Sequence, residues 1–135
     1  MPQVRSGIDR LFIALGALNG AFAVGMGAFG AHGLRGRIEE RLFDAYQTGA
    51  EYHLLHAVAL VVVGLMARTT PPDAPGGMAV RLAGWSMLSG MVLFSGSLYV
   101  MAVTGLRFLG AITPLGGTAF ILAWVALAVA AWKVR

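Results

Sequence analysis

The sequence predicts an all-α integral membrane bundle of four transmembrane helices, with a short interfacial helix between the first and the second. Composition is the first reason, because 58% of the 135 residues are apolar and 12% are charged, against about 45–50% and about 25% in soluble domains. Four long stretches without charge are the second. Apolar and polar residues do not alternate with period 2, so membrane-spanning helices are favoured over barrel strands. The length fits a single transmembrane domain over 1–135.

The first membrane helix is expected at 8–31. Residues 11–31 carry no charge, and as a helix they would cover about 31 Å, the thickness of the hydrocarbon core. A secretory leader usually has an apolar region of about 7–15 residues, so we expect this segment to be retained.

The second membrane helix, expected at 48–67, includes polar residues. Its uncharged stretch, 52–67, is too short to cross a bilayer alone, so the helix must recruit residues from upstream. Just before it, positions 37–47 mix charged and apolar residues, which is typical of a helix lying along the membrane surface. This segment is the predicted interfacial helix.

The third and fourth membrane helices are expected at 80–105 and 114–133. Each contains a long uncharged stretch, and prolines and glycines in the loop 69–77 end the helices on either side of it. Thr113 is expected to cap the last helix, with Pro114 at its first position.

Charge predicts the orientation in the membrane. With four crossings, six Lys and Arg residues lie on the side of the termini and four on the other side. The positive-inside rule therefore predicts that both termini are cytoplasmic.

Small residues indicate where the helices meet. Small side chains let helix backbones approach closely, and this contact supplies much of the association energy in lipid. The positions expected to pack helices together are Gly16, Gly20, Gly27, Gly30, Ser86, Ser89 and Gly90.

His56 is the most unusual residue of the second helix, because it is expected close to the middle of the bilayer. Ionisable groups at this depth usually face the bundle interior or a wet cavity. Tyr52 and His53 share its helical face, whereas Glu51 projects elsewhere. Three roles remain open: a hydrogen bond across the helix interface to Tyr99 or a serine, ligand or proton handling, and metal or haem ligation together with a second histidine.

Several kinds of chemistry are excluded or disfavoured. The chain has no cysteine, so thiolate metal sites, iron–sulfur clusters and cysteine nucleophiles cannot form. Its basic residues are scattered singly, so no nucleic-acid partner is predicted. No carboxylate pair or serine–base pattern is present. We therefore predict no enzymatic activity, no cofactor and no bound metal.

Four motifs occur in order along the chain: Gly27-Ala28-Phe29-Gly30-Ala31-His32; Tyr46-Gln47-Thr48-Gly49 followed by Glu51, Tyr52 and His56; Phe94-Ser95-Gly96-Ser97-Leu98-Tyr99; and Thr113-Pro114-x-Gly116-Gly117. Together they resemble the domain of unknown function 423 family of small membrane proteins. The resemblance implies a multi-pass protein of the bacterial inner membrane with about four helices, and it carries no established activity. The polar motif positions form our candidate pocket: His32, Gln47, Glu51, Tyr52, His56, Ser95, Ser97, Tyr99 and Thr113.

Three functions compete. The first is a non-enzymatic binding or scaffold protein that holds a lipid, a small amphiphile or a partner helix in this pocket. The second is a subunit of a channel or transporter for a proton or small solute, which would have to assemble with further copies or with another membrane protein. The third is a membrane protein that ligates a metal or haem through histidines. The first is preferred because it requires the fewest additional features.

Overall fold

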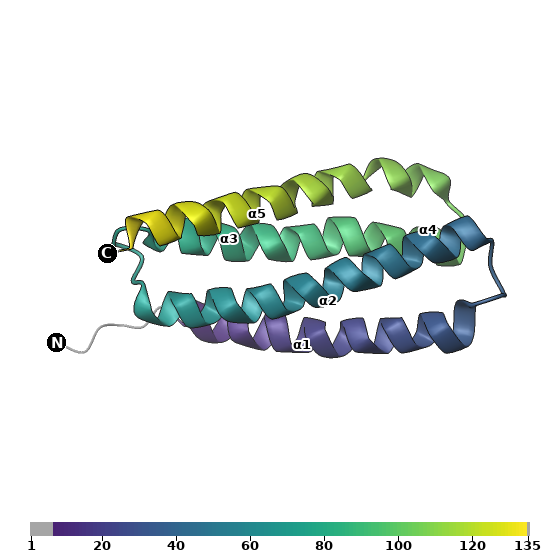
Figure 1. The fold of residues 1–135 in the computed structure, drawn as a ribbon, viewed down its shortest axis with the longest axis horizontal. Coiled ribbons are helices and arrows are strands. Elements are labelled where there is room, and N and C mark those ends of the chain that lie inside the picture. Colours follow the sequence, from purple (N-terminus) through teal and green to yellow (C-terminus); the bar gives the residue numbers. More distant parts are fainter. Residues whose placement is uncertain (1–6, 135) are drawn as a thin grey trace.

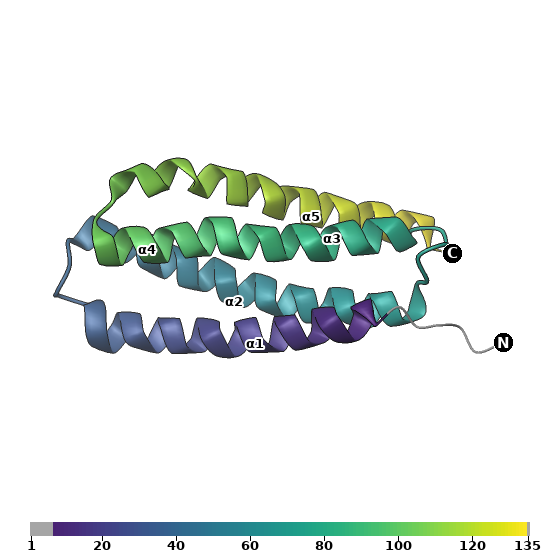
Figure 2. The same cartoon turned by 180° about the vertical axis from the view of Figure 1, so that it is seen from behind.

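A computed structural model describes residues 7–134 and shows an all-α bundle of antiparallel rods (Figure 1). Within this part of the chain, four helical segments are long and apolar enough to cross a membrane: Ile8–Leu34, Glu40–Thr69, Gly77–Thr104 and Arg107–Lys133. The segments run alternately up and down, so the first segment begins and the last segment ends at the same end of the bundle (Figures 1 and 2). The predicted all-α class with four membrane-length helices is confirmed.

Two of the four rods contain a π-helical turn. Helix α1 (Ile8–Phe29) continues into the π-helical turn η1 (Gly30–Leu34). Helix α3 (Gly77–Gly90) passes through η2 (Met91–Gly96) into α4 (Ser97–Thr104). The other elements are α2 (Glu40–Thr69), the 3-10 helix η3 (Arg107–Ala111) and α5 (Thr113–Lys133).

The predicted interfacial helix at 37–47 is wrong as a separate element. Helix α2 begins at Glu40 and runs without interruption to Thr69. No proline lies between these residues, and Gly49 packs against Leu98 instead of breaking the helix. Thirty residues make a helix of about 45 Å, so α2 is long enough to extend beyond a hydrocarbon core of about 30 Å.

Helices α2 and α3 are the most enclosed. In their most apolar stretches 44% of the residues are buried, against 28% in the last span and 17% in the first. Helix α1 packs mainly along α2, and α5 packs along α3. The central core includes Phe12, Leu60, Val80, Met87 and Phe120. Large apolar side chains cover the outside of all four spans, as expected of a surface that faces lipid.

Close helix contacts occur at some of the predicted small residues. A Cβ atom added at Gly16 would come within 2.8 Å of the Val61 backbone nitrogen, and one at Gly90 within 2.3 Å of the Phe120 ring. A Cβ atom added at Gly30 would come within 2.6 Å of the Tyr46 ring, and Ser86 is buried. By contrast, added Cβ atoms at Gly20 and Gly27 would meet nothing within 4 Å, and Ser89 is exposed with its hydroxyl bonded to the Trp85 carbonyl.

Three tight contacts involve glycines that the small-residue pattern did not identify. Gly64 faces the backbone of α1, where an added Cβ would lie 2.8 Å from the Ile13 nitrogen. Gly84 faces the Phe12 ring. Gly116 lies against the η2 backbone, and an added Cβ there would approach the Phe94 nitrogen to 2.2 Å.

The expected cap of the last helix is also corrected. Thr113 is the first residue of α5, and Ile112 occupies the N-cap position without a side-chain cap. The Thr113 hydroxyl instead forms a 2.7 Å hydrogen bond with the Ser97 hydroxyl at the start of α4. Thr113 therefore links two helices.

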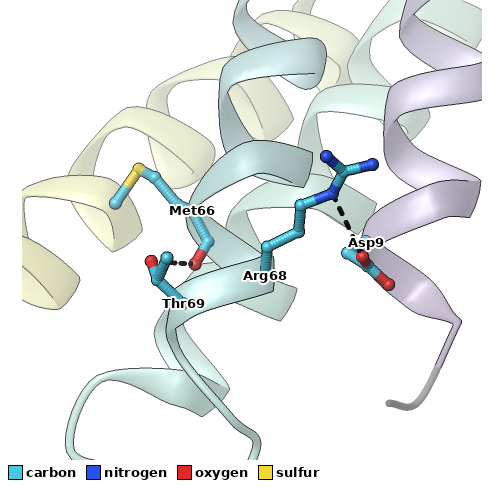
Figure 3. Close-up of polar contacts among 4 residues, drawn as sticks. All are labelled: Asp9, Met66, Arg68 and Thr69. Atoms are coloured by element: carbon cyan, nitrogen blue, oxygen red, sulfur yellow. Dashed lines mark hydrogen bonds and ion pairs between the residues drawn. The ribbon is translucent and has the colours of Figure 1, made fainter.

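An ion pair joins the start of α1 to the end of α2. The Arg68 Nε atom lies 3.3 Å from the Asp9 carboxylate, as Figure 3 shows. Asp9 is buried, whereas about half of the Arg68 side chain is exposed. At the opposite end, Arg107 pairs with Glu39 at 2.7 Å, and both side chains are largely exposed.

Candidate functional site

The predicted polar residues do not form one pocket. The structure distributes them among four places. These are a buried network of His53 and Tyr99, an aromatic cluster around His56, hydrogen bonds of two serine hydroxyls, and the outer surface of the bundle. Each place has its own chemistry.

The buried network crosses three helices and is centred on His53. The Tyr99 hydroxyl on α4 lies 2.9 Å from His53 Nδ1 on α2. The other ring nitrogen, Nε2, lies 2.9 Å from the Asn19 side-chain oxygen on α1. Asn19 in turn donates its amide N–H to the Leu15 carbonyl at 2.8 Å. His53 and Tyr99 are both buried.

The partners in this network fix the direction of each hydrogen bond. The Asn19 oxygen can only accept, so His53 Nε2 carries a proton. Neutral His53 then accepts the Tyr99 hydroxyl proton at Nδ1. The sequence of donors and acceptors ends at the Leu15 backbone carbonyl, which has no proton to pass on. Each polar side chain of the network therefore has a hydrogen-bond partner, and the network connects α1, α2 and α4.

His56 lies in a separate aromatic cluster between α2 and α5. Its ring stacks on Phe120, with centroids 3.6 Å apart and planes 13° apart. Its Nδ1 donates to the Tyr52 backbone carbonyl at 2.7 Å, because a carbonyl can only accept. Nε2 accepts the indole N–H of Trp124 at 3.0 Å. Both nitrogens are engaged, and the residue is 2% exposed.

The serine hydroxyls make local and inter-helix contacts. Ser95, in the η2 turn, is fully buried and donates to the Gly49 carbonyl on α2 at 2.7 Å. Ser97 contacts the Phe94 carbonyl as well as Thr113. These bonds connect η2 to α2 and α4 to α5.

Three of the predicted pocket residues lie on the surface. His32, Gln47 and Glu51 are exposed, and none of them has a hydrogen bond or ion pair with another described residue. His32 lies in η1, whereas His56 lies sixteen residues after the start of α2, about 24 Å along that helix. The idea that these two histidines share a site therefore finds no support in the fold.

An aromatic groove opens to the outside beside His56. Its volume is about 520 Å³, and ten residues line it: Tyr52, Leu55, His56, Phe94, Pro114, Gly117, Thr118, Phe120, Ile121 and Trp124. Tyr52 and Trp124 stand at its rim, 44% and 45% exposed. The lining is mostly apolar and aromatic, with only a few polar groups, which is the usual composition of a small-molecule site.

The groove continues along the bundle. A second hollow of about 310 Å³ shares Leu55 and Trp124 with the first and is lined further by Val58, Ala59, Val62 and Leu127. The two hollows therefore lie next to each other along the α2–α5 boundary, with the polar groups in the wall of the first and apolar side chains around the second. We call the two adjacent hollows the α2–α5 groove.

Metal ligation is not favoured by the geometry. Among residues 7–134, no group of three or more His, Asp or Glu side chains is placed to hold a metal ion. His56 would have to give up its bond with Trp124 to present a free nitrogen.

Sequence reasoning missed several residues of these clusters. His53 is placed on the face of His56 by its spacing, but a bond with Tyr99 is considered only for His56, as one of three open roles. Asn19 is not among the predicted site residues, and nothing in the local pattern marks Phe120 or Trp124. Spacing along one helix identifies a shared face, but it does not identify the residue on another helix that meets it.

Comparison with known proteins identifies relatives among bacterial membrane proteins. Residues 26–117 match a protein-family model described as "Protein of unknown function (DUF423)". The UPF0382 membrane protein YwdK of Bacillus subtilis (strain 168) is 51% identical over 125 residues, covering 92% of this chain and 98% of the relative. UPF0382 membrane proteins of Staphylococcus epidermidis (strain RP62A) and Staphylococcus aureus (strain bovine RF122) are 45% and 43% identical over 124 residues, covering 92% of this chain and 97% of each relative. No solved structure matches the chain significantly.

Proposed function

We propose, from the premise that this chain belongs to the DUF423 (UPF0382) family of bacterial multi-pass membrane proteins, that it is a non-enzymatic protein that binds a single-chain amphiphile in the α2–α5 groove. The observation that carries the proposal is the groove itself, which is open to the membrane and has both aromatic and apolar walls. We also propose the inner membrane as its location, with both termini in the cytoplasm.

The shape of the groove favours an elongated apolar ligand. The two hollows are neighbours, and Leu55 and Trp124 belong to the walls of both. An acyl or isoprenoid chain can lie along such a wall, because aromatic and aliphatic side chains offer dispersion contacts along its whole length.

The polar groups of the groove suggest where the ligand's head lies. The hydroxyl of Tyr52 has no hydrogen-bond partner among the described residues, and Thr118 lies on the facing helix with its hydroxyl bonded to the Pro114 carbonyl. A ligand oxygen placed between these residues can bond the Tyr52 hydroxyl. His56 supports the wall of the groove. Its ring stacks on Phe120 and accepts a hydrogen bond from Trp124, and these contacts hold the two aromatic side chains in place.

A catalytic role for the buried histidines has less support. His56 uses both nitrogens within the protein, and the His53 network ends on a backbone carbonyl. A proton path, as the transporter alternative requires, would have to continue beyond Leu15, and an amide such as Asn19 is a poor proton carrier. These features favour structural roles for both rings.

Photocrosslinking tests the groove proposal. The purified protein would be incubated in vesicles with a long-chain fatty acid that carries a photoreactive diazirine, and modified peptides would be mapped by mass spectrometry. We expect labelling of α2 and α5 beside the groove. Gly117→Leu should abolish this labelling, because Gly117 lines the groove and a leucine side chain would occupy it. The fold should tolerate the change, since an added Cβ makes only ordinary contact with Phe94.

Gly25→Leu is the matched control, since an added Cβ at Gly25 meets nothing within 4 Å and the position lies outside the groove. It should leave the labelling unchanged. Uniform labelling of all lipid-facing surfaces, or labelling that persists in the Gly117→Leu protein, would refute the proposal. Reporter fusions at each terminus and in the loop 69–77 test the orientation separately, with activity on the cytoplasmic side expected at all three positions.

A further inference from the structure

Glu51 is a charged residue far inside a membrane-length helix. Along α2 the nearest charged residue is Asp44, about 10 Å away, and on the other side Arg68 is about 26 Å away. The charged residues of the other spans, such as Arg10, Arg81 and Lys133, differ from Glu51 in that they lie within a few residues of a helix end. A carboxyl group at this depth is costly unless it is neutralised and hydrogen-bonded.

The Glu51 side chain points away from the bundle and has no partner there. It is exposed, as is Gln47 one turn earlier on the same face, and neither forms a hydrogen bond or ion pair with another residue of 7–134. The next residues of this face, Leu54 and Val58, are exposed and apolar. Two polar side chains therefore interrupt an otherwise apolar outer surface.

The surface beside these two residues is hollowed and lined by small residues. A groove of about 150 Å³ runs between α1 and α2, lined by Gly27, Gly30, Ala31, Tyr46, Gln47, Ala50 and Glu51. At Gly27 and Gly20 an added Cβ would meet nothing, so the α1 backbone is open to the outside. Helix α1 also belongs to the least buried of the four spans. An approaching helix can come close here.

We propose that this α1–α2 face is the interface between two copies of the chain, in which Glu51 and Gln47 of one copy hydrogen-bond the same two residues of the other. A protonated carboxyl group and a carboxamide each donate and accept. Two identical faces related by a two-fold axis are therefore complementary. A lipid tail offers neither donor nor acceptor, so it cannot satisfy these groups.

A second copy fits this groove better than an organic cation does. Recognition of a cation by aromatic side chains needs exposed ring faces, but the ring beside Glu51 belongs to Tyr46, which is 1% exposed and has its hydroxyl bonded to the Met26 carbonyl. Glycine and alanine supply much of the remaining wall. This composition suits helix packing. None of the residues that line the α1–α2 groove lines the α2–α5 groove, so variants in the α1–α2 groove test the interface separately from the proposed ligand.

Energy transfer between labelled copies in lipid vesicles tests the interface. The chain has no cysteine, so Asp73→Cys in the exposed middle loop gives a single attachment site for donor and acceptor dyes. We expect energy transfer between the labelled copies. Its efficiency should decrease as the ratio of lipid to protein rises, because dilution in the membrane shifts a dimer toward monomers. Glu51→Leu should weaken association about tenfold, because it removes the inter-copy hydrogen bonds. Glu51→Gln should retain it, because a carboxamide still donates and accepts.

Gly27→Ile should also weaken association by filling the groove, whereas Val125→Ile on the exposed face of α5 should not. As a second measurement, Leu54→Cys should form an inter-copy disulfide under oxidation, and Val125→Cys should not. Unfolding in detergent identifies any variant that is merely misfolded. A protein that stays monomeric at every lipid ratio, or a Glu51→Leu protein that associates like the parent, overturns the proposal. Loss of association in Glu51→Gln also overturns it, since that result requires a negative charge and points to a bound cation.

Discussion

His53 and Tyr99 form a buried hydrogen bond between α2 and α4, with 2.9 Å between the ring nitrogen Nδ1 and the phenol oxygen. The two residues are 46 positions apart in the chain. Asn19 holds the opposite nitrogen of the ring, so the bond is oriented from both sides. This contact is the centre of a polar network in a bundle that is otherwise packed by apolar and small side chains.

Removing the Tyr99 hydroxyl should destabilise the bundle. Tyr99→Phe leaves His53 Nδ1 without a donor in a buried place, which costs roughly 1–3 kcal/mol of unfolding free energy. Reversible unfolding in mixed detergent micelles measures this loss. Tyr52→Phe is the control, because the Tyr52 hydroxyl has no hydrogen-bond partner among the described residues, and it should change stability by less than about 0.5 kcal/mol. Equal effects of the two substitutions would contradict the assigned network.

The indole N–H of Trp124 should stabilise the bundle through its hydrogen bond to His56. Trp124→Phe keeps an aromatic ring but removes the N–H that His56 Nε2 accepts, so we expect a loss of about 1 kcal/mol. Nitrogen NMR of the imidazole should show a proton on Nδ1 in both proteins and a changed Nε2 environment only in the variant. Trp132→Phe is the control, since Trp132 is 90% exposed. A parent spectrum with the proton on Nε2 would refute the assignment.

Gly64 should tolerate no side chain at all. An added Cβ lies 2.8 Å from the Ile13 nitrogen and 2.9 Å from the Asp9 carbonyl oxygen, and neither backbone atom can move independently of α1. Gly64→Ala should therefore force the two helices apart and cost at least about 2 kcal/mol. Gly25→Ala adds the same methyl group where nothing lies within 4 Å, and it should be neutral or stabilising by up to about 1 kcal/mol through helix propensity. Thermal unfolding in detergent compares the pair.

Arg68 should stabilise the junction of α1 and α2 through Asp9. Arg68→Ala leaves the buried Asp9 carboxylate without its partner. A buried charge left unpaired costs about 3–5 kcal/mol, but Arg68 is half exposed and its charge is partly screened. We therefore expect a loss of about 1–2 kcal/mol.

Arg10→Ala provides the contrast for this ion pair. Arg10 is exposed in the first turn of α1 and has no ion pair with a described residue, and a positive charge there opposes the helix dipole. Its removal should leave stability unchanged or slightly higher. An Arg68 variant as stable as the Arg10 variant would show that the Asp9 pair contributes nothing to the fold.

The predictability of the site differed from residue to residue. The depth of His56 follows from its distance to the ends of an apolar stretch, so its burial could be expected from sequence. Its partner could not, because Trp124 belongs to a helix whose rotation and height relative to α2 depend on packing. The same holds for Gly64 and Gly84, which resemble any other glycine in a membrane helix until the facing residue is known.

The error at the start of α2 has a similar cause. Charged residues among apolar ones at 37–47 fit an interfacial helix and the exposed first turns of a longer helix equally well. The structure shows the second arrangement, because α2 is continuous from Glu40 and these residues form its first turns (Figure 1).

The sequence by itself determined that this protein is helical, has four segments long and apolar enough to cross a membrane and carries polar groups within them, because hydropathy and helix length act within a single segment of chain. Only the tertiary structure decided that those polar groups separate into a closed His53 network, an aromatic wall around His56 and an exposed Glu51. Contacts between helices depend on how each rod is rotated and shifted against its neighbour. That choice is made by the summed packing of many small residues, and no single motif records it.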